Sequence, residues 1–62
     1  MIANFYKKNG IGVRNCKLIV TKNIDYIPQK GTSVIFSGQL FTVDRICLDL
    51  DKCEYNLYII RA

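Results

Sequence analysis

Two short runs of alternating apolar and polar residues meet at Gly38, and they constrain the fold more than any other feature of the chain. Val34 and Phe36 alternate with serines before this glycine, and Phe41 and Val43 flank a threonine after it. Alternation with a period of two is typical of a strand with one buried face. A two-residue turn at Gly38 and the residue after it suits a type II′ turn, whose first position needs positive φ. We therefore predict a hairpin in which Phe36 faces Phe41 and Val34 faces Val43.

A second hairpin is predicted at the C-terminal end, with Asp51-Lys52 as its turn. The predicted pairs, counted outward from the turn, are Leu50 with Cys53, Leu48 with Tyr55, and Ile46 with Leu57. The inward residues of this run have even numbers, whereas those just before it have odd numbers. The phase therefore slips at Asp44-Arg45, and we predict a β-bulge or sharp bend there. One long bent strand then serves both hairpins, as in a small sheet that curls into a barrel.

Upstream, Asn9-Gly10 predicts a type I′ turn between a strand over residues 2–8 and the chain from residue 11 onward. Residues 16–21 form another predicted strand, with Leu18 and Val20 inward. A polar loop with Pro28 and Gly31 leads from it to the Gly38 hairpin. With no helical periodicity, the chain is predicted to be a single all-β domain over residues 1–62, built from consecutive antiparallel hairpins.

Composition narrows the classes of partner. The chain has 62 residues, of which 50% are hydrophobic, so a small core leaves apolar surface exposed. The net charge of +4 favours acidic partners, nucleic acid included, although the basic residues are spread along the chain and also serve solubility. An odd number of cysteines, three, and the absence of a leader pattern predict an intracellular protein with reduced thiols. No apolar run approaches the roughly 20 residues of a membrane span.

The stretch from residue 26 to residue 60 resembles SH3-like small β-barrel proteins of the kind encoded by phages and prophages. The resemblance is carried by Pro28, Gly31, Val34, Phe36, Gly38, Phe41 and Val43. Thr32 departs from the pattern, because an Asp commonly follows the glycine there, so a role tied to that carboxylate is not carried over to this chain. The resemblance implies a small SH3-like or five-stranded partly open barrel. It also implies a phage or mobile-element accessory protein that works in the cytoplasm of a host cell.

Catalytic, metal and cofactor sites are not expected. The chain has no His, so Cys16, Cys47 and Cys53 have no imidazole to activate them as nucleophiles. The cysteine spacing lacks the close pair of a structural zinc site. The acidic residues around Asp51 suggest a divalent-cation site, but a hairpin turn explains them better, since the full calcium loop is missing. We therefore predict a non-catalytic binding module without a metal or cofactor.

The predicted binding residues fall into two sets. Apolar side chains on the face away from the core suit contact with a host or virion protein; they are Ile19, Ile35, Tyr58 and Ile60. The alternative is single-stranded nucleic-acid binding, in which tyrosines stack on bases beside basic groups; its residues are Tyr6, Tyr26, Lys22 and Lys30. A homo-oligomeric virion component is a third interpretation, and no membrane partner is expected.

Overall fold

The computed structural model describes residues 1–8 and 16–62, and five strands make up most of that part of the chain. They are β1 (Ile2–Lys8), β2 (Cys16–Asn23), β3 (Ser33–Phe36), β4 (Gln39–Asp49) and β5 (Glu54–Arg61). Neither described segment contains a helix, so neither has a helix that could cross a membrane. The chain is all-β, as the alternation of apolar and polar residues predicts.

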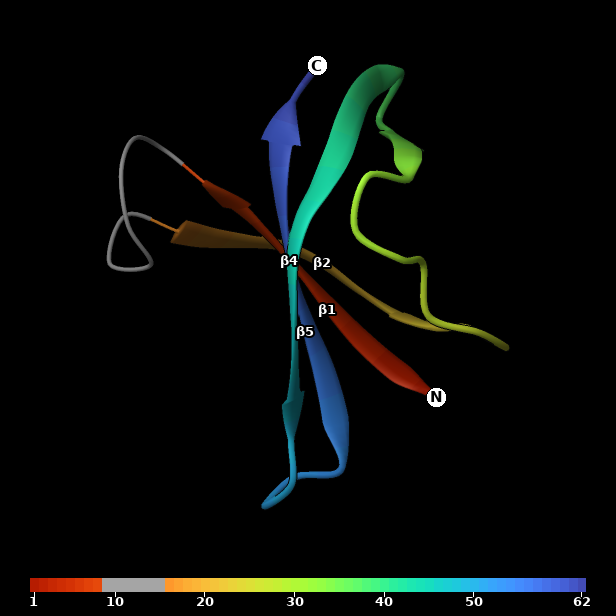
Figure 1. The fold of residues 1–62 in the computed structure, drawn as a ribbon, viewed down its shortest axis with the longest axis vertical. Helices are drawn as coiled ribbons and strands as arrows, with labels where there is room; N and C mark the ends of the chain where they lie inside the picture. Colours follow the sequence, from red (N-terminus) through yellow and green to blue (C-terminus); the bar gives the residue numbers. More distant parts are fainter. Residues whose placement is uncertain (9–15) are drawn as a thin grey trace.

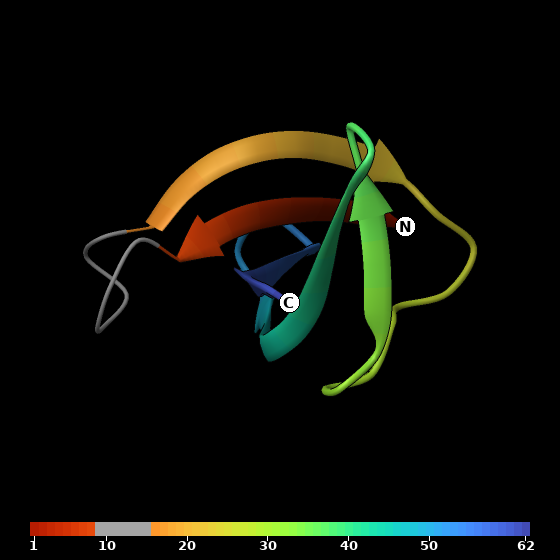
Figure 2. The ribbon, with the colours of Figure 1, turned by 90° about the horizontal axis from the view of Figure 1, so that it is seen from above.

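The strands form one mixed sheet in the order β2-β1-β5-β4-β3. Neighbouring strands run antiparallel, except that β1 and β5 run parallel. The sheet curls through 222° into a half-barrel that stays open between its edge strands, β2 and β3. In Figure 1 the twisted strands overlap along the direction of view, and Figure 2 shows the curve of β1 and β2 with β3 standing across them. The predicted partly open five-stranded barrel is confirmed. The prediction of consecutive antiparallel hairpins did not foresee that β1 and β5 pair in parallel.

The β3–β4 hairpin has the predicted faces but not the predicted register. Its turn is Ser37-Gly38, one residue earlier than predicted, and the two φ values are 53° and 76°. Two positive φ values are typical of a type I′ turn, whose twist matches that of the flanking strands. Val34 therefore pairs with Phe41, not with Val43. The two registers differ by two residues and side chains alternate with a period of two, so the same residues still face the core.

Strand β4 bends where the phase of its apolar residues slips. Val43 pairs with Ile59 and Arg45 pairs with Tyr58, which leaves Asp44 as the extra residue of a β-bulge. The predicted bulge at Asp44-Arg45 is confirmed. Beyond it the register of β4 and β5 is also as predicted, with the pairs Ile46 to Leu57, Cys47 to Asn56 and Leu48 to Tyr55.

The turn between β4 and β5 is wider than predicted. The ladder ends at the pair of Asp49 and Glu54, and residues 50–53 form the turn. The Asp49 carboxylate accepts hydrogen bonds from the backbone N–H groups of Asp51 and Lys52, at 3.1 and 3.2 Å. This side-chain capping stabilises the longer turn. The predicted inward pair of Leu50 and Cys53 is therefore wrong, and the Leu50 side chain is 77% exposed.

Strands β1 and β2 pair from one end of β1 to the other, although the predicted Asn9-Gly10 turn lies outside the described residues. A bulge interrupts this pairing, because Phe5 pairs with Val20 but Tyr6 pairs with Leu18. Ile19 is the extra residue.

The bulge reverses the predicted faces of the residues around it. Leu18, predicted to be inward, lies opposite Tyr6 on the outer face and is 48% exposed. Ile19, predicted to lie on the outer face, is half-buried and packs against the core. The prediction was wrong for both residues because strict alternation cannot continue through an inserted residue.

The segment from residue 24 to residue 32 connects the two edge strands and covers part of the concave face. Ile24 and Ile27 pack against the core. The loop, which was predicted to be polar, therefore supplies two apolar side chains to the interior. At its end Gly31 has a φ of 92°, and its N–H donates to the carbonyl of Val43 at 2.8 Å. The predicted tight re-entry at Gly31 is confirmed, since a residue with a side chain would be strained there.

The core lies on the concave face of the half-barrel. Its buried side chains come from three adjacent strands and are Ala3, Phe5, Phe41, Val43, Leu57 and Ile59. Among the described residues no polar or charged side chain is buried in it. The three central strands β1, β5 and β4 therefore supply the stable part of the domain, and the two edge strands lie at its margin.

Candidate functional site

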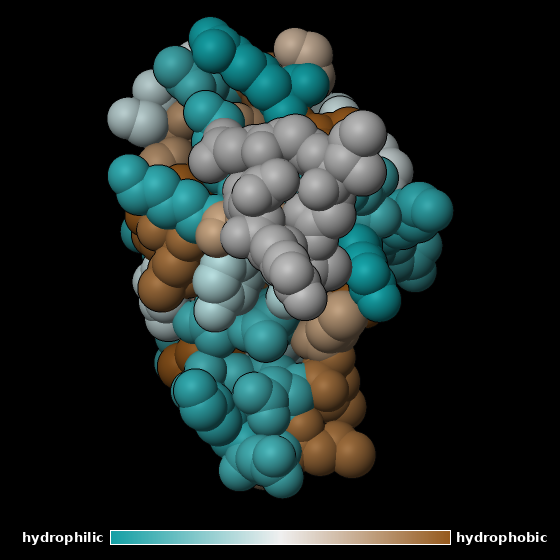
Figure 3. Space-filling view, turned by 90° about the vertical axis from the view of Figure 1, so that its left-hand side faces the viewer, coloured by the Kyte–Doolittle hydropathy of each residue, from teal (hydrophilic) through white to brown (hydrophobic). Residues whose placement is uncertain are grey.

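A line of apolar and aromatic side chains crosses all five strands on the outer, convex face of the sheet. We call it the outer stripe, and its residues are Ile35 on β3, Leu40 on β4, Ile60 and Tyr58 on β5, Tyr6 on β1 and Leu18 on β2. The pairs Ile35 to Leu40, Tyr58 to Tyr6 and Tyr6 to Leu18 are direct cross-strand neighbours. Between β4 and β5 the stripe is linked only diagonally, because Ile60 pairs with Thr42, two residues from Leu40. Figure 3 shows the side opposite the β2–β3 loop, where hydrophobic surface lies among hydrophilic surface.

Exposure along the outer stripe is lowest at the two central tyrosines and highest at Ile35 on β3, while Leu18 at the β2 end is 48% exposed. Tyr6 and Tyr58 are half-buried, Ile60 and Leu40 are 38% and 48% exposed, and Ile35 is 75% exposed. A single exposed apolar residue is ordinary, but a continuous line of them is typical of a surface that binds another molecule. The part of the stripe on β3, β4 and β5 is therefore the part best placed for contact.

The two tyrosines in the middle of the stripe stack on each other. The ring centroids of Tyr6 and Tyr58 are 5.4 Å apart, with an angle of 23° between the planes. Burial raises the pKa of the Tyr58 hydroxyl, and Cys47, Tyr6 and Cys16 raise it further, while Arg45 opposes the shift. Tyr58 is therefore a neutral, partly covered ring at neutral pH. Each ring already has an aromatic neighbour, which leaves less face for a nucleic-acid base.

One ion pair crosses the outer face beside the tyrosines. The Lys8 Nζ atom lies 2.8 Å from an Asp44 carboxylate oxygen, so β1 is joined to the bulge of β4 across β5. The hydrogen bond from Lys8 lowers the pKa of the Asp44 carboxyl, and the positive charges of Lys8, Lys30 and Arg45 act in the same direction. Lys8 is thus occupied by a carboxylate, which reduces the basic character of this face.

A polar network occupies the same face at the other end of β1. The Asn4 side-chain amide donates to Glu54 at 2.8 Å and to Asn56 at 3.0 Å, and it accepts a hydrogen bond from the Thr21 hydroxyl at 2.7 Å. These four side chains come from three adjacent strands. Because they satisfy one another, this end of the outer face is explained by folding alone.

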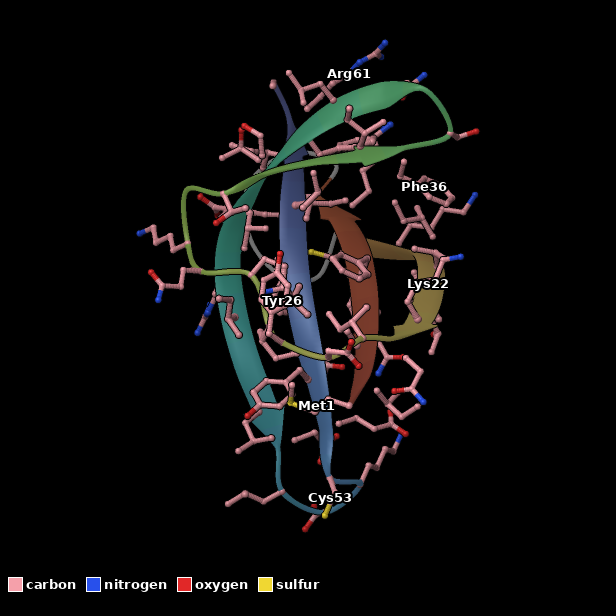
Figure 4. All side chains as sticks on the ribbon, turned by 90° about the vertical axis from the view of Figure 1, so that its right-hand side faces the viewer. Met1, Lys22, Tyr26, Phe36, Cys53 and Arg61 are labelled. Atoms are coloured by element: carbon pink, nitrogen blue, oxygen red, sulfur yellow. The ribbon has the colours of Figure 1, made fainter. Side chains whose placement is uncertain are left out.

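The concave face has an apolar groove at the opening of the half-barrel. Its volume is about 140 Å³, and its lining residues are Phe5, Ile19, Val20, Lys22, Ile24, Val34, Ile35, Phe36 and Ile59. Lys22 on β2 and Phe36 on β3 lie on the same side of the molecule in Figure 4. The edge strands β2 and β3 therefore form the two walls of the groove, and Lys22 is its one charged lining residue.

The structure brings together three of the four residues predicted to bind a protein. Ile35, Tyr58 and Ile60 all belong to the outer stripe, and Ile35, on the edge strand, also borders the groove. Ile19 lines the groove and does not belong to the stripe. Their role in binding stays a prediction.

The four residues of the nucleic-acid alternative are not gathered on one face. Tyr6 is on the outer face, Lys22 lines the groove, and Tyr26 and Lys30 lie on the loop between β2 and β3. Figure 4 shows Tyr26 on this loop, apart from Lys22. The alternative also stays a prediction.

Two members of the outer stripe were missed by sequence reasoning. Leu40 shares the phase of Thr42, so alternation along β4 places it outward, and this signal was present in the sequence. Leu18 was missed because the bulge at Ile19 has no mark in a run of apolar residues. Alternation of apolar and polar residues cannot locate a bulge whose extra residue is apolar and has apolar neighbours.

The acidic residues near the last turn have a structural use, because Asp49 caps the turn as described above. Across residues 1–8 and 16–62, no group of three His, Cys, Asp or Glu side chains is arranged to hold a metal ion. The groove and the outer stripe are therefore the features of the described surface that folding alone does not explain.

Comparison with known proteins gave no match to a family model, to a curated protein or to a solved structure.

Proposed function

We propose that the chain is a non-catalytic module that binds a protein through the β3 end of the outer stripe. The observation that carries this proposal is the exposed cross-strand pair of Ile35 and Leu40, with the exposed Ile60 diagonal to Leu40 on the next strand. Apolar side chains that are already ordered by a sheet lose little conformational freedom on binding. The net charge of +4 favours approach of an acidic partner.

The SH3-like resemblance and its setting belong to this proposal. A curled five-stranded sheet with an open side supports a small barrel of that general kind. On this basis the partner is a host or virion protein met in the host cytoplasm, and the protein acts by occupying a surface on it. Binding to single-stranded nucleic acid is a less favoured function, because its predicted residues are spread over different parts of the surface.

Two matched substitutions test the proposed function. Ile35→Asp and Leu50→Asp change residues of almost equal exposure, 75% and 77%, but only Ile35 belongs to the outer stripe. Each folded variant is used to isolate partners from host lysate, with and without nuclease. We expect Ile35→Asp to lose a protein that Leu50→Asp retains, whether or not nuclease is present. Equal retention by both variants, or loss of all binding after nuclease treatment, would contradict the proposal.

A further inference from the structure

The free edge of β3 presents the backbone groups of two residues. The N–H of Val43 donates to the carbonyl of Thr32 at 2.9 Å, so residue 32 is bonded to β4. Hydrogen-bonded and non-bonded pairs alternate along an antiparallel ladder. Val34 and Phe36 therefore also bond to β4, whereas the N–H and C=O groups of Ser33 and Ile35 point away from it. Because β3 is an edge strand, no other strand in the described part of the chain pairs with these groups.

The apolar groove begins beside this edge. Val34 and Phe36 point to the concave side, where they form the wall of the groove on β3, and both are only half-buried. A strand added next to β3 would alternate its side chains between the two faces. One set would enter the groove, and the other would lie beside Ile35 on the outer stripe.

Lys22 gives the groove a preference for an acidic ligand. Its side chain is exposed and forms no ion pair within residues 1–8 and 16–62. It is the one charged residue that lines the groove, and it stands on the wall opposite β3. A carboxylate on the groove side of an added strand would therefore meet a basic partner there.

We propose that the free edge of β3 binds an extended strand of a partner protein, which pairs with Ser33 and Ile35 and places apolar and acidic side chains toward the groove and Lys22. This inference rests on the proposed function and specifies how the partner is recognised. Strand addition to an exposed edge obtains affinity from main-chain hydrogen bonds and specificity from alternate side chains.

A second copy of this chain is a poorer occupant. Its edge strands β2 and β3 contain no Asp or Glu, so neither offers Lys22 a carboxylate. Each copy also carries a net charge of +4, which opposes self-association. A strand from a different protein that carries both apolar and acidic side chains can pair with β3, fill the apolar groove and offer Lys22 a carboxylate.

The test is selection of a random peptide library, displayed on messenger RNA, against the whole chain. We expect the enriched peptides to alternate apolar residues and to contain an acidic residue. Binding should fall about tenfold in Ile35→Pro, which removes one outward N–H, and should be unchanged in Ile35→Val, which keeps it. Lys22→Glu should weaken binding about fivefold, and Lys17→Glu, on the same strand but outside the groove, should not.

Several outcomes would overturn the inference. One is enrichment of no peptide, and another is equal binding to the parent and to a folded Ile35→Pro variant. A third is a concentration-dependent mass that shows a second copy on the edge. Peptides that tolerate Ile35→Pro but not Ile35→Asp would overturn strand addition and leave the proposed protein contact in place. Loss of both proposals would require, in addition, that Ile35→Asp retain every partner isolated from lysate.

Discussion

The two edge strands of the sheet, β2 and β3, differ in how they are protected against pairing with another chain. Strand β2 has eight residues, includes Lys17 and Lys22, and contains the bulge at Ile19. Strand β3 has four residues and no charge, and it exposes Ile35. Lysines and bulges are common means of preventing unwanted strand pairing, and short length is another. Only the last of these protects β3.

This difference explains why one side of the opening is the better binding edge. On β2, the amino terminus donates hydrogen bonds to the Asn23 side chain and the Ile24 carbonyl, at 2.8 and 2.9 Å, which fixes the end of the strand. On β3, an uncharged edge precedes a type I′ turn and borders an apolar groove. An edge without charge is an aggregation hazard unless a partner uses it. We infer that β2 closes one wall of the groove and that β3 receives the partner.

The largest expected effect separates the centre of the sheet from the β3 edge. Leu57 on β5 is fully buried, so Leu57→Ala should lower the free energy of unfolding by about 4 kcal/mol, through lost burial and a cavity. Ile35→Ala should change it by less than about 0.5 kcal/mol, because an exposed side chain contributes little. Urea denaturation of both variants measures the difference. A large loss of stability in Ile35→Ala would mean that Ile35 is a structural residue. The β3 edge and the central strands would then not differ in their contribution to stability.

A pair of proline substitutions tests the direction of the backbone groups on β3. Val34→Pro removes an N–H that bonds to β4 and leaves a carbonyl of β4 without its donor, so we expect a loss of about 2 to 3 kcal/mol. Ile35→Pro removes an N–H at the free edge, where proline is tolerated, and the loss should be about 1 kcal/mol or less. Denaturation monitored by circular dichroism gives both values. If Ile35→Pro were the more damaging of the two, the register of the hairpin would be different from that described above.

Proline on the other edge sharpens the comparison between β2 and β3. The Met1–Ile24 backbone hydrogen bond at 2.8 Å sets the alternation along β2, which turns the N–H of Thr21 to the free edge. Thr21→Pro is thus the β2 equivalent of Ile35→Pro. We expect it to leave peptide binding within about twofold of the parent, in contrast to the tenfold loss for Ile35→Pro. Isothermal titration with a selected peptide measures both, and an equal loss would show that the two edges share the binding.

The smallest expected effect concerns the ion pair that ties β1, the neighbour of β2, to β4, the neighbour of β3. Lys8 lowers the pKa of the Asp44 carboxyl below its ordinary value of 3.8. The stabilisation from this shift is therefore complete above the unfolded pKa and is lost as the pH falls through the lower, folded pKa. Asp44→Asn should flatten the decline of stability in this acid range, and Lys8→Met should have the same effect. Thermal unfolding below about pH 5 checks this, and an unchanged acid decline in both variants would contradict it.

Local patterns predicted the face of most residues, but they did not predict every register. The slip at Asp44-Arg45 was visible because the inward residues change from odd to even numbers, and the bulge lies there. The Gly38 turn was placed one residue late, because Ser37 adopts positive φ and alternation cannot distinguish registers that differ by two.

Other features depend on contacts between distant parts of the chain, and so the sequence pattern did not reveal them. The parallel pairing of β1 with β5 joins the two ends of the chain, and no local turn specifies it. The bulge at Ile19 follows from the pairing of β1 with β2 and reverses two predicted faces. The outer stripe was predicted in part, from Ile35, Tyr58 and Ile60, whereas the groove depends on how far the sheet curls.

Amide hydrogen exchange of the folded chain, followed by NMR, is the most direct test of the free β3 edge. In the chain alone, we expect the N–H groups of Val34 and Phe36 to be protected and those of Ser33 and Ile35 to exchange rapidly. A bound peptide should protect Ser33 and Ile35 while leaving the N–H of Thr21 on β2 unchanged. Protection of Ile35 in the chain alone, or peptide-induced protection at Thr21 without any at Ile35, would contradict the account.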